Sequence, residues 1–120
     1  MAFDVYVKID GIEGESTDYR HPGWIEVLYF KTHLNQEISS TASSAGGASA
    51  ERVDFDDFVI TKQLDKASPK LASACAAGTH INIIVIEICR AGTDKVKFME
   101  YKLTNCIISK VTFEGLILFV

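Results

Sequence analysis

Apolar and mostly polar residues alternate strictly at the start of the chain. Phe3, Val5, Val7 and Ile9 occupy every second position. A period of two places these side chains on one face of an extended segment, with the intervening residues on the other face. The pattern predicts a β-strand with one buried face that ends at Gly11.

Turn-rich segments separate the next apolar stretches. The segment from Gly11 to Gly23 is polar and predicts a loop, whereas residues 24–34 and 53–62 are rich in β-branched and aromatic residues and predict strands. Asp56 and Asp57 interrupt the second of these strands and indicate a bulge. Residues 36–51 are mainly serine, threonine, alanine and glycine, which predicts a long exposed loop.

One short helix is predicted after these strands, at about residues 69–77. Ser68 is a suitable N-cap, Pro69 suits the first helical position, and Gly78 follows the last helix-forming residue. The remaining apolar segments predict three strands and the beginning of a fourth. Their ranges are 80–90, 96–105, 106–113 and 116–120.

These elements predict one mainly β domain over residues 1–120, a small barrel or sandwich of antiparallel strands with the helix packed outside it. The segment 81–88 is apolar at both alternating sets of positions, so we expect it to be buried on both faces. The helix is too short to cover much of the outer face. We therefore expect self-association, and Ile84 and Ile86 are candidates for a subunit interface.

Composition and charge narrow the possible functions. The 120 residues are 48% hydrophobic and 23% charged, as in globular domains, and the net charge of −4 leaves no basic stripe for nucleic acid. We expect no membrane insertion, because no apolar run approaches the roughly 20 residues that span a bilayer. The N-terminus resembles no secretory signal, so folding in the cytoplasm is expected. Three cysteines without Cys-x-x-Cys spacing predict neither a disulfide framework nor a zinc knuckle.

Two groups of residues could suggest nucleophilic chemistry. Ser16, Asp18 and His21 lie close together in the sequence, but a catalytic triad depends on spatial geometry, and hydrogen bonding within local turns is the favoured interpretation. Cys75 and His80 could form a thiol site, although the alanines around Cys75 favour a neutral thiol in the core. We therefore expect a protein without catalytic residues that is not an enzyme.

Three histidines and three neighbouring aspartates are the candidates for metal binding. The histidines fall on separate predicted elements without paired-ligand spacing, and the aspartates lack the glycine and distal glutamate of a calcium loop. We accordingly predict no metal site and no cofactor. The candidates are His21, His33 and His80, and Asp54, Asp56 and Asp57.

Three groups of motifs stand out along the chain. They are residues 3–16 with Asp18, His21 and 24–28; residues 61–62, 65–69 and Leu71; and Cys75, residues 78–81 and 90–92. In combination they resemble the haemolysin-coregulated protein (Hcp) family of bacterial type VI secretion. The first group resembles the opening of that family's chains, the second its strand-to-helix junction, and the third its helix end and next hairpin. Together the motifs extend over most of residues 3–112.

The resemblance implies a small β-barrel with a flanking helix whose subunits form hexameric rings. Stacked rings would make the inner tube of a contractile injection machine, which contacts a spike protein and a sheath, carries effector proteins and is secreted on firing. The predicted loop at 36–51 resembles the family's protruding loop, which contributes contacts between subunits or rings. The candidate contact residues there are Ser39, Ser40, Thr41, Ser44, Gly46 and Gly47.

Two alternatives stay open at this point. Similar proteins usually continue past the equivalent of Val111 through a polar loop to a final strand, so residues 113–120 either replace that strand or the sequence lacks a segment. The second alternative is functional, namely a monomeric binding barrel for a small apolar ligand or a peptide. Its interior would be lined by Val5, Val7, Leu28 and Phe30.

Overall fold

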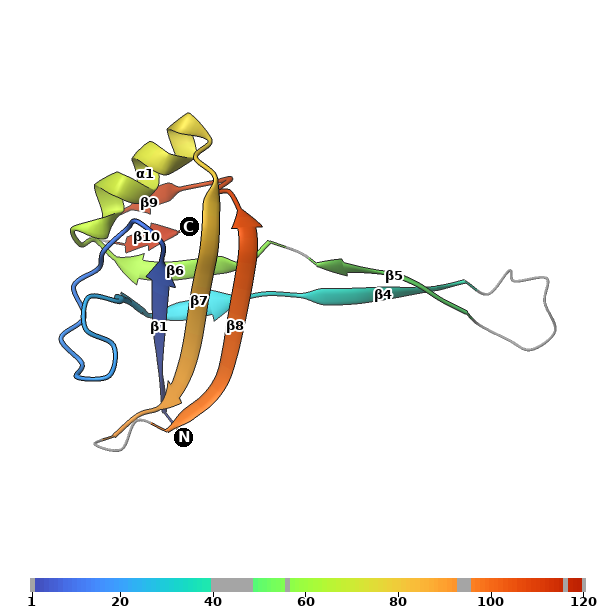
Figure 1. Ribbon diagram of the computed structural model, residues 1–120, viewed down its shortest axis with the longest axis horizontal. Helices are drawn as coiled ribbons and strands as arrows, with labels where there is room; N and C mark the ends of the chain where they lie inside the picture. Colours follow the sequence, from blue (N-terminus) through green and yellow to red (C-terminus); the bar gives the residue numbers. More distant parts are fainter. Residues whose placement is uncertain (1, 40–48, 56, 93–95, 116, 120) are drawn as a thin grey trace.

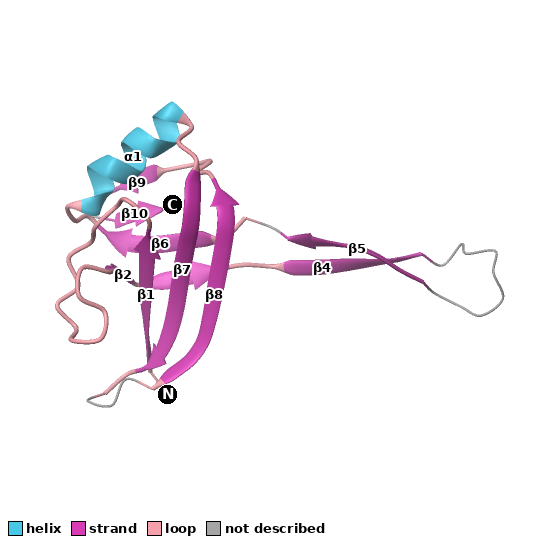
Figure 2. Cartoon of the chain, viewed as in Figure 1, coloured by secondary structure: helices cyan, strands magenta, loops and turns pink. Residues whose placement is uncertain are grey.

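The computed structural model describes residues 2–39, 49–55, 57–92, 96–115 and 117–119 (Figure 1). Ten strands and one helix lie in these ranges (Figure 2). In chain order they are β1 (Phe3–Ile9), β2 (Ile25–Val27), β3 (Tyr29–Lys31), β4 (Leu34–Ser39), β5 (Ser49–Phe55), β6 (Val59–Gln63), α1 (Ala67–Ala77), β7 (Ile81–Arg90), β8 (Lys97–Cys106), β9 (Thr112–Glu114) and β10 (Ile117–Phe119).

The strands form three antiparallel sheets. Sheet A has the order β2-β1-β7-β8, sheet B has the order β3-β6-β10-β9, and β4 pairs with β5 alone. Sheet B crosses sheet A at a steep angle, with α1 across one end, while the β4–β5 ribbon projects far from this body (Figure 1). A backbone hydrogen bond from the Leu28 N–H to the Thr61 carbonyl, 2.8 Å long, connects the β2–β3 corner to β6.

The hydrophobic core lies between the two sheets and beneath α1. Every second residue of β1 and β7 points into it, because the register pairs Val5 with Ile88 and Val7 with Ile86. Leu71 on α1 is completely buried in the same cluster. The buried members are Val5, Val7, Ile9, Ile25, Val27, Ile60, Ala67, Leu71, Ala74, Ile81, Ile86, Ile88 and Ile108.

The prediction of a mainly β fold with one short helix is confirmed, and so is the first strand at β1. The expected closed barrel is not seen, since the strand pairings of the described residues leave the two four-stranded sheets open.

The described chain contains no helix that is both long and apolar enough to cross a membrane.

The segment predicted as one strand at 24–34 is instead divided between three strands. β2 belongs to sheet A, β3 to sheet B, and β4 to the ribbon. The chain changes sheet at Leu28, whose side chain is 59% exposed. Apolar composition predicted extended backbone correctly but could not indicate corners, which depend on the partner strand.

The prediction of a loop over residues 36–51 is wrong at both ends. β4 and β5 pair antiparallel from Leu34 opposite Phe55 to Ser39 opposite Ser49, with one irregularity after Gln36. Residues 40–48 lie outside the described part. A ribbon that projects from the body needs no continuous apolar face, so its polar composition concealed the strands.

The bulge expected at Asp56 and Asp57 is instead the boundary between β5 and β6. Asp56 lies outside the described residues and Asp57 is exposed. The predicted strand at 53–62 is thus divided between the ribbon and sheet B.

Near the C-terminus, β10 pairs with β6 and β9, so residues 117–119 form a strand in sheet B.

The helix begins at Ala67, two residues earlier than predicted. The Ser68 side chain does not cap the helix, because it is hydrogen-bonded to residues that precede the helix. Its hydroxyl accepts a hydrogen bond from the Asp65 N–H (3.0 Å) and another from the ammonium of the fully buried Lys62 (3.0 Å). The Asp65 carboxylate in turn accepts from Lys62 (2.6 Å) and from the Ala67 N–H (3.0 Å). This buried charge is therefore paired and hydrogen-bonded, as burial requires. The predicted helix end is confirmed at Gly78, in the left-handed conformation.

Candidate functional site

The loop between β1 and β2 folds back over the outer face of sheet A. Backbone hydrogen bonds join Gly14 to Gly23 (2.8 Å) and Ser16 to Trp24 (2.9 Å), so the loop closes on itself. A Cβ atom at Gly14 would lie 2.5 Å from the Trp24 carbonyl oxygen and 2.7 Å from the Ile25 backbone. Only glycine permits this close approach of the two backbone segments.

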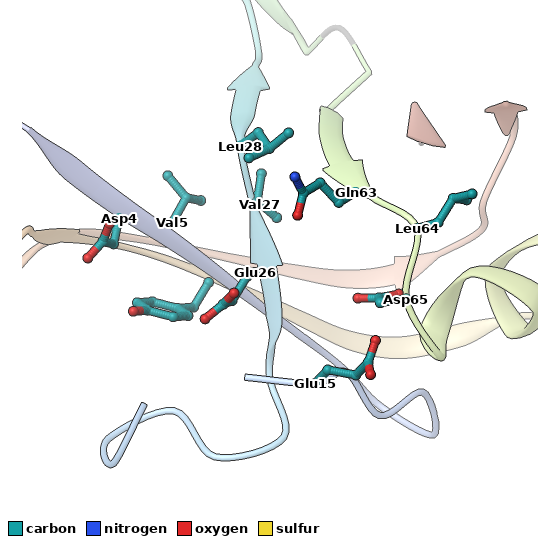
Figure 3. Close-up of a pocket in the computed structure, with 10 residues that line it drawn as sticks. Asp4, Val5, Glu15, Glu26, Val27, Leu28, Gln63, Leu64 and Asp65 are labelled. Carbon is teal, nitrogen blue, oxygen red and sulfur yellow. The ribbon is translucent and has the colours of Figure 1, made fainter. Parts of the chain in front are cut away.

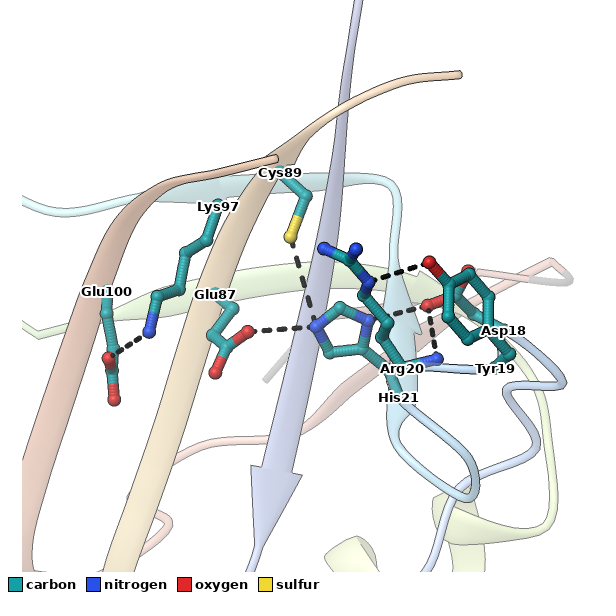
Figure 4. A network of polar contacts seen from close by, with 8 residues as sticks. All are labelled: Asp18, Tyr19, Arg20, His21, Glu87, Cys89, Lys97 and Glu100. Atoms are coloured by element: carbon teal, nitrogen blue, oxygen red, sulfur yellow. Dashed lines mark hydrogen bonds and ion pairs between the residues drawn. The ribbon is translucent and has the colours of Figure 1, made fainter. Parts of the chain in front are cut away.

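His21 is the buried tip of this loop, with 3% of its surface exposed. Its Nδ1 lies 2.7 Å from Asp18 Oδ2 and its Nε2 lies 2.9 Å from Glu87 Oε1 on β7 (Figure 4). The Sγ atom of Cys89, two residues further along the same face of β7, lies 3.9 Å from Nε2. We call Asp18, His21, Glu87 and Cys89 the His21 cluster.

Two aromatic rings fix the orientation of the imidazole. Tyr6 on β1 stacks on the ring with centroids 4.2 Å apart and planes 5° from parallel. Trp24 meets the imidazole edge-on, with centroids 4.8 Å apart. The imidazole is therefore held by aromatic packing as well as by hydrogen bonds.

In this geometry each ring nitrogen faces a carboxylate oxygen. A carboxylate only accepts hydrogen bonds, so both contacts form as hydrogen bonds when both nitrogens carry protons. His21 therefore connects its own loop to β7 through its two ring nitrogens.

The structure brings together all three residues of the predicted Ser16, Asp18 and His21 group, but not as a triad. The Ser16 hydroxyl accepts a hydrogen bond from the Asp18 N–H (3.2 Å), and the His21 Nε2 faces Glu87. A serine nucleophile would need that nitrogen as its base. The predicted turn hydrogen bonding is confirmed. Sequence reasoning missed Glu87 and Cys89, because the strand register that brings them to His21 joins residues more than sixty positions apart.

A second surface lies at the same end of sheet A but on the other face, near the start of β1 and β8. Cys89 pairs with Asp4 and its neighbour Arg90 pairs with Phe3, and Phe3, three residues from Tyr6 on β1, points to the opposite face. Four large apolar side chains here are about half exposed, and the rings of Phe3 and Phe98 meet edge-on with centroids 5.3 Å apart. β8 is also the last strand of sheet A, and no described strand pairs with its outer edge. We call this surface the apolar end; its residues are Phe3, Val96, Phe98 and Met99.

An exposed ion pair lies beside the apolar end. The Lys97 ammonium donates a hydrogen bond to the Glu100 carboxylate at 2.8 Å. That hydrogen bond and the opposite charge raise the pKa of Lys97 and lower the pKa of Glu100. Further along β8, burial raises the pKa of the Cys106 thiol and so favours its neutral form.

The predicted contact residues have different positions. Ile86 is 1% exposed and packs inside the subunit's own core, and Ile84 packs against that core. The apolar residues that β7 presents outward are Ile83, 40% exposed, and the half-buried Val85, so the expected burial of both faces holds only for the inner face. Ser39 ends β4. The other predicted contacts, Ser40, Thr41, Ser44, Gly46 and Gly47, lie outside the described residues.

The predicted apolar lining of a ligand barrel is distributed over core and surface. Val5 and Val7 belong to the packed core, Phe30 packs beside it, and Leu28 is mostly exposed. The pocket in Figure 3 instead has a volume of about 420 Å³ and lies between β1, β2 and the β6–α1 junction. Four carboxylates line it, which does not suit an apolar ligand. They are Asp4, Glu15, Glu26 and Asp65.

The other candidate residues stand apart from one another. His33 and His80 are exposed, and Cys75 packs against the core from α1. The side chain of Asp54 is not among those described. In the described part of the chain, the group of histidine, cysteine and acidic side chains close enough to share a cation is His21, Glu87 and Cys89.

Comparison with known proteins gives consistent matches over nearly the whole chain. Residues 6–118 match the family described as type VI secretion system effector, Hcp. The Protein hcp1 of Pseudomonas aeruginosa is 33% identical over 116 residues, which are 96% of this chain and 70% of that protein.

Solved structures agree with that match. One described as a type six secretion system protein superposes with a TM-score of 0.89 at 34% identity, covering 98% of this chain and 76% of the other. Hcp1 from Salmonella typhimurium gives a TM-score of 0.78 at 29% identity, covering 99% and 79%.

Proposed function

The chain belongs to the Hcp family of type VI secretion tube proteins, and on that premise we propose that its subunits join into hexameric rings. The rings would stack into the inner tube of the secretion machine. By the same proposal the protein is made in the cytoplasm, leaves the cell with the expelled tube and has a structural role without catalysis.

The observation that carries this proposal is the apolar end together with the open edge of β8. Phe98 and Met99 are 56% and 51% exposed, and Phe3 is 46% exposed. Exposed apolar residues that cluster beside an unpaired strand edge are typical of a surface that another chain covers. A head-to-tail contact of this kind closes into a ring when its rotation divides the circle evenly.

The projecting β4–β5 ribbon supports the second level of assembly. It extends far from the body of the subunit, and the whole molecule measures 57 × 38 × 27 Å. We propose that the ribbon reaches a neighbouring subunit or the next ring, as was expected for this segment. The spike protein, the sheath and effector proteins carried in the lumen are the partners proposed from family membership.

Negative-stain electron microscopy of the purified chain tests the ring proposal. We expect closed rings from the wild-type protein and their loss in Phe98→Asp, which places a charge in the apolar end. Tyr19→Asp is the matched control, because Tyr19 is also an exposed aromatic residue and lies in the β1–β2 loop, away from the edge of β8. Folded wild-type protein that forms no rings, or equal loss of rings in both variants, would contradict the proposal.

A further inference from the structure

The His21 cluster contains the donor atoms of a metal site as well as those of a hydrogen-bond network. His21 Nε2, a Glu87 carboxylate oxygen and Cys89 Sγ all lie within 4.8 Å of one another. Imidazole nitrogen, thiolate sulfur and carboxylate oxygen are the three ligand types that zinc takes in proteins. Glu87 and Cys89 share one face of β7, since residues two apart in a strand point the same way.

The separations of these atoms are close to those around a tetrahedral cation. With zinc–nitrogen and zinc–oxygen bonds of about 2.0–2.1 Å and a zinc–sulfur bond of about 2.3 Å, the nitrogen and oxygen would lie about 3.3 Å apart and the nitrogen and sulfur about 3.6 Å apart. The observed separations are 2.9 Å and 3.9 Å. The Glu87 oxygen and Cys89 Sγ would lie about 3.6 Å apart around zinc, and they are within 4.8 Å of each other. Side-chain shifts of up to about 1.2 Å would bring all three atoms to these separations, and Glu87, 18% exposed, can move.

Asp18 supplies the outer contact that a ligating histidine needs. Metal-bound histidines almost always donate their other N–H to a carboxylate or a carbonyl, which fixes the tautomer and the ring orientation. Here Asp18 Oδ2 is 2.7 Å from His21 Nδ1, so the proton is held on Nδ1 and Nε2 is directed at Glu87 and Cys89. Stacking on Tyr6 restricts rotation of the ring.

We propose that His21, Glu87 and Cys89 form a binding site for a thiophilic divalent cation of the zinc class, with Asp18 as the positioning residue. The cation would displace one proton from the Cys89 thiol and, where the ring is doubly protonated, one from Nε2, and both protons would pass to solvent. Three protein ligands leave a fourth position for a water molecule.

Charge balance is consistent with this occupant. One carboxylate and one thiolate neutralise a divalent cation, and the neutral imidazole adds no charge. Cys89 is completely buried and His21 nearly so, and Glu87 is the most exposed of the three ligands, so the cation would enter past Glu87. The bound ion would join the β1–β2 loop to β7, and this consequence is independent of ring formation.

Cobalt(II) titration of the reduced, full-length protein tests the site, because the absorption spectrum of bound cobalt depends on the atoms that coordinate it. We expect one cobalt per chain, a thiolate-to-cobalt charge-transfer band in the near ultraviolet, and its disappearance when zinc is added. Cys89→Ser should abolish the band, whereas Cys75→Ser and Cys106→Ser should retain it. The three cysteines thus provide matched controls.

Two further variants test the site without changing Cys89, because a substitution at this buried residue could impair folding. Glu87→Gln should lose most of the zinc affinity, and Asp18→Asn should weaken zinc binding by about 10- to 100-fold, as removal of an outer-shell carboxylate does. Circular dichroism establishes that each variant is folded. Absence of the charge-transfer band in the wild-type protein would overturn the proposal, and so would a band that survives in folded Cys89→Ser. The cluster would then act only as a hydrogen-bonded bridge between the β1–β2 loop and β7.

Discussion

The two faces of sheet A are covered differently at the end where β1 and β8 begin. On the face of Tyr6 and Cys89, the chain covers the sheet with its own β1–β2 loop, and His21 holds that loop through polar contacts. On the other face, around Phe3 and Phe98, no described segment covers the sheet, and the apolar residues are about half exposed. The first face is completed within one subunit. The second is the face that we propose a neighbouring subunit completes.

The comparison shows why apolar content alone does not locate an interface. Both faces carry aromatic residues of sheet A, and they differ in whether the same chain returns to cover them. The covering loop is polar and turn-rich, and its close approach to β2 depends on Gly14. A surface is available to a partner only where no such loop exists.

Removal of His21 should have the largest effect on the stability of the subunit. His21→Ala removes the imidazole hydrogen bond from each of the partly buried carboxylates of Asp18 and Glu87, which costs about 1–3 kcal/mol in the unfolding free energy for each. Urea unfolding with a metal chelator present, in the Phe98→Asp background that separates subunits, measures this loss. The exposed His33→Ala is the control and should stay within about 0.5 kcal/mol of its parent. Equal losses would show that the loop is not fastened at His21.

A methyl group at Gly14 should disturb the covered face to a smaller extent. Gly14→Ala forces a Cβ against the backbone of Trp24 and Ile25, and we expect about 1–3 kcal/mol of destabilisation. Trp24 is the only tryptophan, so its fluorescence in the folded protein reports the shift directly. Gly11→Ala strains a backbone with φ of 85° but places its Cβ in open space, so it should leave that fluorescence unchanged. An unchanged spectrum in Gly14→Ala would contradict the close approach.

Substitution at the apolar end should barely change the stability of a single subunit. Phe98→Asp alters a half-exposed side chain, so its unfolding free energy should lie within about 0.5 kcal/mol of the wild-type value in dilute, monomeric solution. If Phe98→Asp also loses its rings, the residue contributes to assembly and not to the stability of the single subunit. A loss as large as that of His21→Ala would place Phe98 in the subunit's own core instead.

The Lys97–Glu100 ion pair should have the smallest effect. The lowered pKa of Glu100 means that its stabilisation is lost only as the pH falls through that pKa, and the raised pKa of Lys97 means that its stabilisation is lost only as the pH rises through that pKa. Both groups are fully exposed, so salt screens them. Stability should therefore be flat near neutral pH, and Lys97→Met should not change it measurably in 0.5 M salt, a concentration of about three times physiological ionic strength. A clear salt-resistant loss would contradict this.

The sequence predicted those features that depend on local patterns. The alternation from Phe3 to Ile9 located β1, and Gly78 marked the end of α1. The start of α1 was misplaced because Ser68 bonds to Lys62 and Asp65, a tertiary use of a residue typical of helix caps. The β4–β5 ribbon was missed because a projecting ribbon lacks the apolar face that alternation detects.

The His21 cluster could be predicted only in part. Local spacing brought Asp18 and His21 together, but Glu87 and Cys89 reach them through the pairing of β1 with β7, in which Tyr6 lies opposite Glu87. The outward face of β7 was likewise misassigned, because periodicity separates two faces without saying which one is inside. The pairing register of strands, and which face of a sheet other segments cover, depend on the whole fold. The residue pattern of one strand therefore cannot predict them.

Native mass spectrometry of the purified chain at micromolar concentration tests the central claim most directly. If a neighbouring subunit covers the apolar end in the proposed hexameric ring, the wild-type protein gives a species with the mass of six chains, and Phe98→Asp gives single chains. A wild-type protein that is folded and has the mass of one chain would contradict the assembly proposed from the apolar end.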